Sequence, residues 1–444
     1  MHIAFVAMSG VRAWNPDITA AGLTMPGFLE RSQTIASLPS LSLLTLAGMT
    51  PDAFDVSYHE ILDIRDLGEL PVCDVAAIAS YSAQIKEAYE LADRFRAAGV
   101  KVILGGLHVT ALADEALEHA DAVVVGEGEI GWPDVLADLR RGRLQRLYAP
   151  NGREFDLADA PMPRYDLLDI ERYNRLTVQT TRGCPWQCEF CAASMRLTPR
   201  YKVKPVARVM AEIHEIRRFW PRPFIEFADD NTFVDRRRSK ELMRAVAGER
   251  IKWFTETDIS VADDPELLSL MHDAGCVEVL IGLESPTRAG VAGVEQRRDW
   301  KQSRFDDYQA AIERIQSHGI AVNGCFVLGL DGDGPDVFEA VERFVRESGQ
   351  FDVQITVMTA FPGTPLYARL KAEGRLLVEG AWEQCTLFDV NFLPMGMSPE
   401  VLQHEALELG RRLYTAEERA ARRQRFHDQR RRYLRRQKAM RCIA

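Results

Sequence analysis

The sequence has few cysteines, no long hydrophobic run and no excess of positive charge. Its 444 residues include eight cysteines, which are too few and too unevenly spaced for a disulfide framework. No apolar run approaches the roughly 20 residues that cross a bilayer. The first ten residues, MHIAFVAMSG, lack the basic lead and long apolar stretch of a signal peptide. The net charge of −10 argues against nucleic-acid binding. We therefore expect a cytoplasmic protein with two or three domains.

Positive charge is densest near the C-terminus. Arginine is dense from Arg419 to Arg441, with five of these arginines close together: Arg430, Arg431, Arg432, Arg435 and Arg436. The simpler interpretation is a solvated terminal helix. The alternative is peripheral contact with an anionic membrane surface or with an acidic partner.

Short apolar segments alternate with helical segments through residues 1–145. The expected strands are His2–Ala7, Phe54–Glu60, Val75–Ser80, Val102–Leu104 and Ala122–Val125, and helices are expected at Leu41–Gly48, Gln84–Ala98 and Trp132–Arg140. This alternation predicts a doubly wound, Rossmann-like α/β domain. Four glycines follow its strands where such a fold binds ligands: Gly105, Gly106, Gly126 and Gly128. Ordinary turn chemistry explains glycines there equally well.

A second strand–helix series follows a linker that is rich in proline and aspartate, predicted at 146–174. Its expected strands are Leu176–Thr180, Phe224–Ala228, Trp253–Thr257, Glu278–Gly282, Ala321–Leu328 and Gln354–Thr359. Helices are expected at Ala207–Arg218, Ser239–Ala247, Pro265–Ala274 and Phe305–His318. The series predicts a partial (β/α)6 barrel at 175–370 with its chemistry at the carboxyl ends of the strands. A small, mainly helical region is expected at 371–444.

Three cysteines, Cys184, Cys188 and Cys191, follow the first expected strand of this second series. Thiolates spaced by three and two residues fit around one corner of an iron–sulfur cubane and leave its fourth iron without a protein ligand. No nearby histidine or cysteine completes a zinc site. The motif therefore predicts a reactive cluster. The other five cysteines are expected to be small buried residues or inert thiols: Cys73, Cys276, Cys325, Cys385 and Cys442.

This cysteine loop, with Phe190 before its last cysteine, resembles that of the radical S-adenosylmethionine (SAM) superfamily. The resemblance implies a [4Fe–4S] cluster whose open iron binds SAM, with Phe190 among the residues near the cofactors. It implies one-electron cleavage of SAM to methionine and a 5′-deoxyadenosyl radical, which abstracts hydrogen from the substrate. It also implies an external electron donor such as flavodoxin or ferredoxin.

The resemblance extends to the ends of other strands. The family usually has a glycine–glycine–glutamate-like turn after the second barrel strand, which grips the SAM amino group. This chain has Asp229 and Asp230 there, which keep acidic acceptors for an ammonium. A helix cap is the alternative for both. Glu256 and Glu284 end the third and fourth strands, where the resemblance implies contacts to SAM and a buried charge pair is the alternative.

The domain before the barrel resembles the cobalamin-binding domain of one large radical SAM subclass. The resembling stretches are SLPSLSLLTLAGMTP (37–51), VILGGLHVTAL (102–112) and VVVGEGE (123–129), so the resemblance implies that the four glycines contact cobalamin. No histidine has an aspartate two positions before it, so the cobalt-ligating Asp-x-His-x-x-Gly pattern is absent, as is common in this subclass. His108 is a candidate for contact with the corrin or, equally, a structural residue.

Most members of this subclass are methyltransferases. The resemblance therefore implies a cobalamin-dependent methyltransferase that acts on a small-molecule or lipid-like substrate, nearest to the hopanoid- and tetrapyrrole-modifying branch. A non-methylating mutase or cyclase, which contracts or closes a ring, is the alternative within the superfamily. An iron–sulfur electron-transfer or sensor protein is the alternative from another class.

Overall fold

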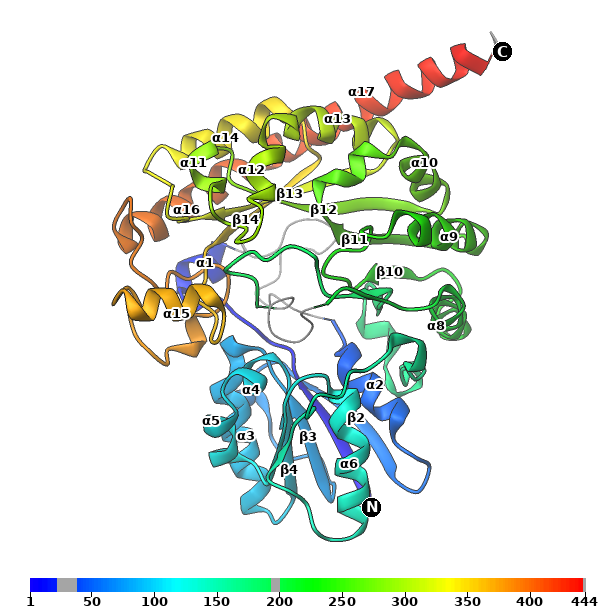
Figure 1. Ribbon diagram of the computed structural model, residues 1–444, viewed down its shortest axis with the longest axis vertical. Helices are drawn as coiled ribbons and strands as arrows, with labels where there is room; N and C mark the ends of the chain where they lie inside the picture. Colours follow the sequence, from blue (N-terminus) through cyan, green and yellow to red (C-terminus); the bar gives the residue numbers. More distant parts are fainter. Residues whose placement is uncertain (22–37, 193–199, 442–444) are drawn as a thin grey trace.

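Two six-stranded parallel sheets form the frame of the protein, and the barrel sheet lies above the N-terminal sheet in the view of Figure 1. The computed structural model describes residues 1–21, 38–192 and 200–441, with side chains up to residue 435. Ser37, at the start of one resembling stretch, and Cys442 lie outside the described residues.

The N-terminal sheet has the strand order β2-β1-β3-β4-β5-β6. Its strands are β1 (His2–Met8), β2 (Asp55–Ile61), β3 (Val75–Ala79), β4 (Lys101–Gly105), β5 (Ala122–Val124) and β6 (Leu147–Tyr148). Helices α2 (Leu41–Met49) and α6 (Gly128–Arg140) cover one face, and α3 (Ile85–Ala97) and α5 (Ala113–His119) cover the other. The predicted doubly wound α/β fold is confirmed. Among the strands of this sheet, only β6 was not expected, because two residues carry no readable pattern and it lies inside the predicted linker.

The second sheet follows chain order from one edge to the other, β7-β10-β11-β12-β13-β14. Its strands are β7 (Leu176–Val178), β10 (Phe224–Phe227), β11 (Lys252–Thr257), β12 (Cys276–Glu284), β13 (Ala321–Leu328) and β14 (Asp352–Val357). Its helices are α8 (Val206–Phe219), α9 (Arg236–Val246), α10 (Pro265–Asp273), α13 (Tyr308–Ser317) and α14 (Val337–Ser348). Sequential order with both edges unpaired is a partial barrel, as predicted.

The side chains of a barrel strand alternate between two environments. Ile225 and Phe227 of β10 are fully buried under the outer helices, whereas Glu226 between them points to the inside of the barrel. Trp253 and Thr255 of β11 are buried in the same way. Because successive side chains of a strand point to opposite faces, the inner face of the barrel is left with the polar residues.

The C-terminal region is mainly helical, with α15 (Pro365–Ala372), α16 (Pro399–Leu413) and α17 (Ala416–Arg441). Arg422 near the start of α17 is 1% exposed, and its Nη1 donates to the carbonyl of Leu413 at 2.8 Å. The far end of the helix projects away from the body (Figure 1). The arginine-rich tail is therefore a terminal helix that is docked at one end. Through the described ranges, no helix has both the length and the apolarity of a membrane span.

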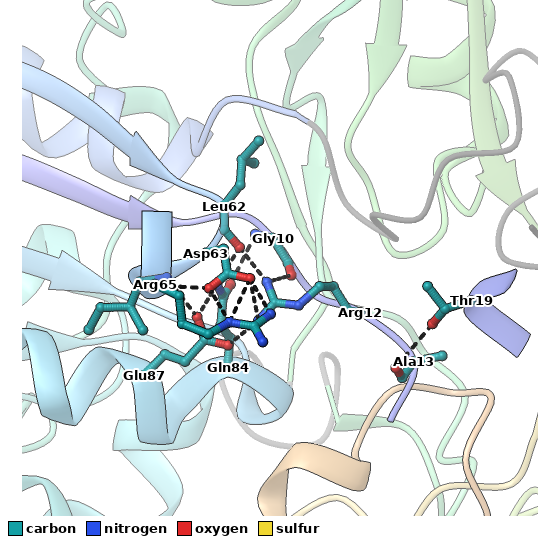
Figure 2. A network of polar contacts seen from close by, with 10 residues as sticks. Gly10, Arg12, Ala13, Thr19, Leu62, Asp63, Arg65, Gln84 and Glu87 are labelled. Atoms are coloured by element: carbon teal, nitrogen blue, oxygen red, sulfur yellow. Dashed lines mark hydrogen bonds and ion pairs between the residues drawn. The ribbon is translucent and has the colours of Figure 1, made fainter. Parts of the chain in front are cut away.

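A segment at residues 9–21 leaves β1 and crosses to the barrel. Gly10 lies so close to Leu62 that a Cβ on it would meet the Leu62 carbonyl oxygen at 1.6 Å, so this position requires glycine. Arg12 Nη1 donates to the carbonyls of Gly10, at 2.8 Å, and Leu62, at 2.5 Å, and its Nη2 pairs with Glu87 (Figure 2). These contacts anchor the crossing segment to the N-terminal sheet.

The two ends of the chain are exchanged between the two cores. Val11, Ala13 and Ile18 of the crossing segment belong to the barrel core. Trp382 and Cys385, which follow α15, belong to the core of the N-terminal sheet. Each sheet is therefore completed by residues from the opposite end of the chain.

Candidate active site between the two sheets

A cleft of about 370 Å³ lies at the carboxyl ends of β1, β3, β4 and β5, where the N-terminal sheet meets the barrel. The four predicted glycines all line it: Gly105, Gly106, Gly126 and Gly128. The barrel contributes Gln179, Arg182, Ala228 and Asp230. This volume falls within the roughly 300–1,000 Å³ of ligand sites. The fold thus brings turns that are distant in sequence to one cleft beside the barrel.

Backbone forms much of the cleft edge. Gly106, at φ +111°, and Gly126, at φ +78°, adopt left-handed conformations that favour glycine. The Gly126 N–H donates to Thr110 Oγ1 at 2.9 Å, which fixes this turn. A Cβ on Gly105 would make only ordinary contact, 3.6 Å from the Val124 carbonyl oxygen. At these glycine positions the turns bring backbone without a side chain to the cleft, which suits the close approach of a large flat ligand such as a corrin.

His108 does not line this cleft. Its ring is 1% exposed, with Nδ1 at 3.1 Å from Ser82 Oγ and Nε2 at 3.2 Å from Glu115 Oε1. Trp382 packs edge-on against it at 5.3 Å between ring centroids. The structure therefore favours the structural interpretation of His108. No histidine is among the residues that line the cleft in the part of the chain described.

The three-cysteine loop follows β7 and the short strand β8 (Thr181–Arg182). Cys188 is buried, and Cys184 and Cys191 are partly exposed. Burial raises the pKa of the Cys184 thiol to about 11 and the pKa of Cys188 above its usual range, so ligation of iron must displace protons. Among the described residues, no three His, Cys, Asp or Glu side chains converge on one metal ion. Three separate thiols can each bind a different iron, which is the ligand set that a cubane with one open iron requires.

One side of the loop is held by Asp258, which the sequence did not single out. Asp258 Oδ2 accepts from Trp186 Nε1 at 3.0 Å and from Asn231 Nδ2 at 2.8 Å. Asn231 Nδ2 also lies 3.7 Å from Cys184 Sγ. Although burial opposes ionisation, hydrogen bonds from Asn231, Ser260 and Trp186 lower the pKa of Asp258. An ionised carboxylate therefore orients the loop between its first two cysteines.

The other side of the loop is held by Glu295, which is 2% exposed. Its Oε1 accepts from the Gln187 backbone N–H at 3.2 Å, and its own backbone forms an antiparallel bridge with Cys188. Trp186 stacks on Trp300, with ring centroids 4.3 Å apart. Glu295 lies more than a hundred positions from the cysteines. No local pattern could reveal this contact.

Asp229 and Asp230 differ in position. Asp229 is buried, and its carboxylate accepts from the backbone N–H groups of Thr180 and Thr181, at 2.7 and 2.8 Å, and from the Thr180 hydroxyl at 2.6 Å. Asp230 lines the cleft and accepts from the Gly183 N–H at 2.7 Å. Burial raises the pKa of both carboxyls. Only Asp230 keeps acceptor capacity toward the cleft.

The helix-cap alternative for Asp229 and Asp230 is wrong. The cap of the following helix, α9, is Asp235, whose Oδ1 accepts from the Arg238 N–H at 3.1 Å.

Glu284 forms a buried charge pair, which is the alternative to a contact with SAM. Its Oε1 lies 2.7 Å from Lys301 Nζ, and Lys301 also donates to the Gly282 carbonyl at 2.6 Å. Glu284 has φ +65°, which is unusual for a residue with a side chain. Lys301 and Glu284 lie close enough to Cys188 to affect the pKa of that thiol in opposite directions.

Glu256 has no such partner within the described ranges. Its side chain is reached by solvent inside the barrel, opposite to the buried Trp253 face of β11. Although solvent reaches this side chain, the protein that surrounds it on the inner face of the barrel partly desolvates it, and together with the carboxylates of Glu226, Asp230 and Asp229 this raises the pKa of Glu256 to about 8. It is therefore a carboxyl that can exchange a proton near neutral pH.

Arg182 joins the cysteine loop to the glycine turn across the cleft. Its Nη1 donates to Glu127 Oε1 at 2.8 Å, and its Nη2 donates to Glu129 Oε1 at 2.6 Å. Lys202 Nζ donates to Glu127 Oε2 at 2.7 Å. Despite burial, pairing with Arg182 lowers the pKa of Glu129. The turn Gly126–Glu129 is thus fixed to the barrel by charge.

The radical SAM superfamily model matches residues 178–345. The chain belongs to the radical SAM superfamily. It is a radical SAM enzyme, with a [4Fe–4S] cluster and SAM as cofactors. A domain of unknown function, DUF4070, matches residues 364–443, which include the arginine-rich helix.

Curated relatives match most of the chain. A bacteriochlorophyllide d C-12(1)-methyltransferase of Chlorobaculum tepidum is 28% identical over 389 residues, which cover 85% of this chain and 83% of the relative. A hopanoid C-2 methylase of Rhodopseudomonas palustris is 26% identical, covering 77% of this chain and 66% of the relative. TsrM from Kitasatospora setae, solved with cobalamin and a [4Fe–4S] cluster bound, covers 94% of this chain and 91% of its own at TM-score 0.68 and 15% identity. The likeness to TsrM establishes a shared fold across both sheets.

In this radical SAM enzyme the predicted residues do not all share one site. The four glycines and Asp230 share the cleft, whereas Glu256 lies inside the barrel. Glu284 lies near Cys188, and Phe190 packs against the barrel core. Arg182, Glu127 and Glu129 were missed, although each lies inside or beside a predicted motif. Their opposite charges were the available signal.

Proposed function

We propose that this radical SAM enzyme is a cobalamin-dependent methyltransferase that acts in the cytoplasm on a small-molecule or lipid-like substrate. The cleft carries the proposal, because its glycine turns and its barrel residues Arg182 and Asp230 adjoin two candidate cofactor sites. The relatives that methylate bacteriochlorophyllide and hopanoids support the substrate class. A flavodoxin or ferredoxin would supply electrons, and the arginine-rich helix is a candidate for peripheral membrane contact.

Each cofactor would have its own set of residues. Cys184, Cys188 and Cys191 would hold the cluster, and Asp230 would accept from the SAM ammonium. The glycine turns would hold the corrinoid without a histidine ligand to cobalt. When bound, the cluster and SAM supply a one-electron cleavage that makes a substrate radical, and the corrinoid supplies the transferable methyl group. Arg182 would hold the two sites in register, and the buried loop contacts would limit access of water.

The proposal assigns a role to each part of the chain. Residues 1–145 would bind the corrinoid, 146–174 would link the two sheets, 175–370 would carry the radical chemistry and 371–444 would complete both cores. The exchange of chain ends supports close contact between the first and third parts.

A steric probe at Gly105 tests the corrinoid site. Gly105→Leu should lower corrinoid content while iron content stays unchanged, because the backbone accepts a Cβ there and the longer side chain enters the cleft. Gly105→Ala is the matched control and should retain corrinoid. Optical spectra and cobalt and iron analysis of protein from cobalamin-replete cells measure both.

A second pair separates backbone strain from ligand contact. Gly126→Val and Gly99→Val strain nearly the same conformation, φ +78° and +80°, but only Gly126 lines the cleft. Of these two variants, only Gly126→Val should lose corrinoid. A wild-type protein that contains no corrinoid and gains none on reconstitution would contradict cobalamin dependence.

Transfer of a labelled methyl group distinguishes the methyltransferase from a mutase or cyclase. If corrinoid binds but labelled SAM never transfers its methyl group to it, a mutase or cyclase replaces the methyltransferase. Failure of the reconstituted, reduced protein to cleave SAM would leave only an electron-transfer or sensor role.

A further inference from the structure

Two arginines, Arg297 and Arg298, lie in the chain next to Glu295, which contacts the cysteine loop. Arg297 and Arg298 are both exposed, and neither guanidinium forms an ion pair with any residue in the described ranges. Arg288 and Arg369, by contrast, pair with Asp306 and Glu189. The chain carries a net charge of −10. Two positive charges without a described ion-pair partner make the electrostatic potential of this acidic protein locally positive.

The turn that carries these arginines is fixed to the cysteine loop. The Arg297 and Arg298 N–H groups donate to the Glu295 carboxylate, at 3.1 and 2.7 Å, and the same carboxylate accepts from Gln187 of the loop. The Gln296 N–H donates to the Gln187 carbonyl at 3.0 Å. The backbone that carries the two arginines therefore has a defined place next to Cys188, whose backbone forms a bridge with that of Glu295.

A stacked aromatic pair lies at the same place. Trp186, between the first two cysteines, stacks on Trp300, and both rings are partly exposed. Polarisable rings between the surface and the cysteine loop are suited to electron entry.

We propose that the Arg297–Arg298 turn is the docking surface for a small acidic one-electron carrier protein of the flavodoxin or ferredoxin kind. This inference rests on the proposed role of Cys184, Cys188 and Cys191 as cluster ligands. One electron leaves the reduced donor and enters the cluster, and no bond or proton is exchanged in that step. Complementary charge steers the encounter and raises its rate more than its affinity, which suits a brief electron-transfer contact.

Charge reversal tests the surface. In reconstituted full-length protein, Arg297→Glu with Arg298→Glu should slow cluster reduction by reduced flavodoxin on the order of tenfold at low ionic strength. The salt dependence of that rate should weaken as well. Reduction by dithionite, and SAM cleavage driven by dithionite, should be unchanged, because the turn is held through its backbone.

The matched control is Arg431→Glu with Arg432→Glu on α17. It changes net charge equally, and both arginines are exposed on the projecting helix. The control should leave the flavodoxin rate within about twofold of wild type.

Two results would overturn the docking surface: an unchanged flavodoxin rate in the Arg297/Arg298 variant, or equal or greater slowing in the α17 control. The second result would assign docking to overall charge or to the arginine-rich helix. If dithionite cannot drive SAM cleavage in wild type, the proposed function fails instead, and the dithionite measurement identifies that case.

Discussion

The two sheets are built from the same parallel βα units, yet they present different groups to the cleft between them. The N-terminal sheet offers backbone at Gly105, Gly106 and Gly126, and the carboxylates of its Glu127 and Glu129 are occupied by Arg182. The barrel offers ionisable groups such as Asp230 and Arg182. The first edge is suited to recognition by shape, and the second to recognition by charge and ligation.

The difference follows from how each sheet is covered. Helices pack on both faces of the N-terminal sheet, so adjacent residues such as Phe5 and Val6 of β1 are both fully buried. Helices cover only the outer face of the barrel sheet, which leaves Glu226 and Glu256 on the inner face. An open inner face admits charged side chains that a doubly covered sheet excludes.

The largest expected effect is loss of the cluster from the barrel, with corrinoid binding retained. Changing Cys184, Cys188 and Cys191 together to Ala should abolish cluster binding and SAM cleavage, because no ligands to the irons remain. Corrinoid content should persist, since the glycine turns are untouched. Iron analysis and a SAM-cleavage assay measure the loss, and Cys73→Ala should leave both at wild-type level. A triple variant that keeps its cluster would refute the ligand assignment.

The next largest effect is a loss of unfolding free energy when the ion pairs between the two sides of the cleft are removed. Arg182→Met leaves Glu127 and Glu129 buried without their shared partner, which should cost about 3–5 kcal/mol of unfolding free energy. Urea unfolding measures it. Arg153→Met removes an ion pair whose members are both 50% exposed, and should cost only about 0–1 kcal/mol. Equal losses in the two variants would mean that Arg182 is not a structural link.

A smaller effect separates the two aspartates. Asp230→Asn should raise the SAM dissociation constant roughly ten- to hundredfold, because one charge-assisted hydrogen bond of about 1.5–3 kcal/mol is lost while the fold is retained. Asp229→Asn should instead lower thermal stability, because its carboxylate holds Thr180 and Thr181. Calorimetric titration with SAM and thermal unfolding distinguish the two. Unchanged SAM affinity in Asp230→Asn would remove this residue from the site.

The smallest effect concerns pH. The pKa of Glu256 is raised from its ordinary value near 4.5 to about 8, so the folded state binds the proton more tightly than the unfolded state. Glu256 therefore contributes stability below about pH 4.5 that is lost as pH rises to about 8. Glu256→Gln should gain thermal stability relative to wild type across that window.

The pKa of Glu278 is also raised to about 8, so both carboxyls change the stability of the wild type in the same pH range. The difference between wild type and Glu256→Gln isolates the contribution of Glu256. Melting curves at several pH values measure the difference. A difference that does not vary with pH would contradict the shifted pKa.

The two parallel sheets and the sequence motifs of the site could be predicted from the sequence. Apolar runs separated by helical patterns placed all six barrel strands, because strand burial leaves a local signature. Contacts between motifs could not be predicted. The roles of Glu295, Asp258 and Lys301 depend on long-range approach, which leaves no periodic trace in the chain.

The two aspartates show the same limit at one position. Asp229 and Asp230 are adjacent and chemically identical, yet the chain turns one toward threonine hydroxyl and amide groups and the other toward the cleft. Residue type and position in the motif therefore cannot distinguish Asp229 from Asp230. Only the path of the backbone after β10 decides which carboxylate is free.

The exchanged chain ends set an order of events during synthesis. The N-terminal sheet is translated first, but Trp382 and Cys385 of its core leave the ribosome only after the whole barrel. At about 5–20 residues per second the nascent sheet waits on the order of tens of seconds with part of its apolar surface uncovered. A ribosome-bound chain that ends before Trp382 should therefore recruit chaperones, and the two halves should not mature as separately expressed proteins.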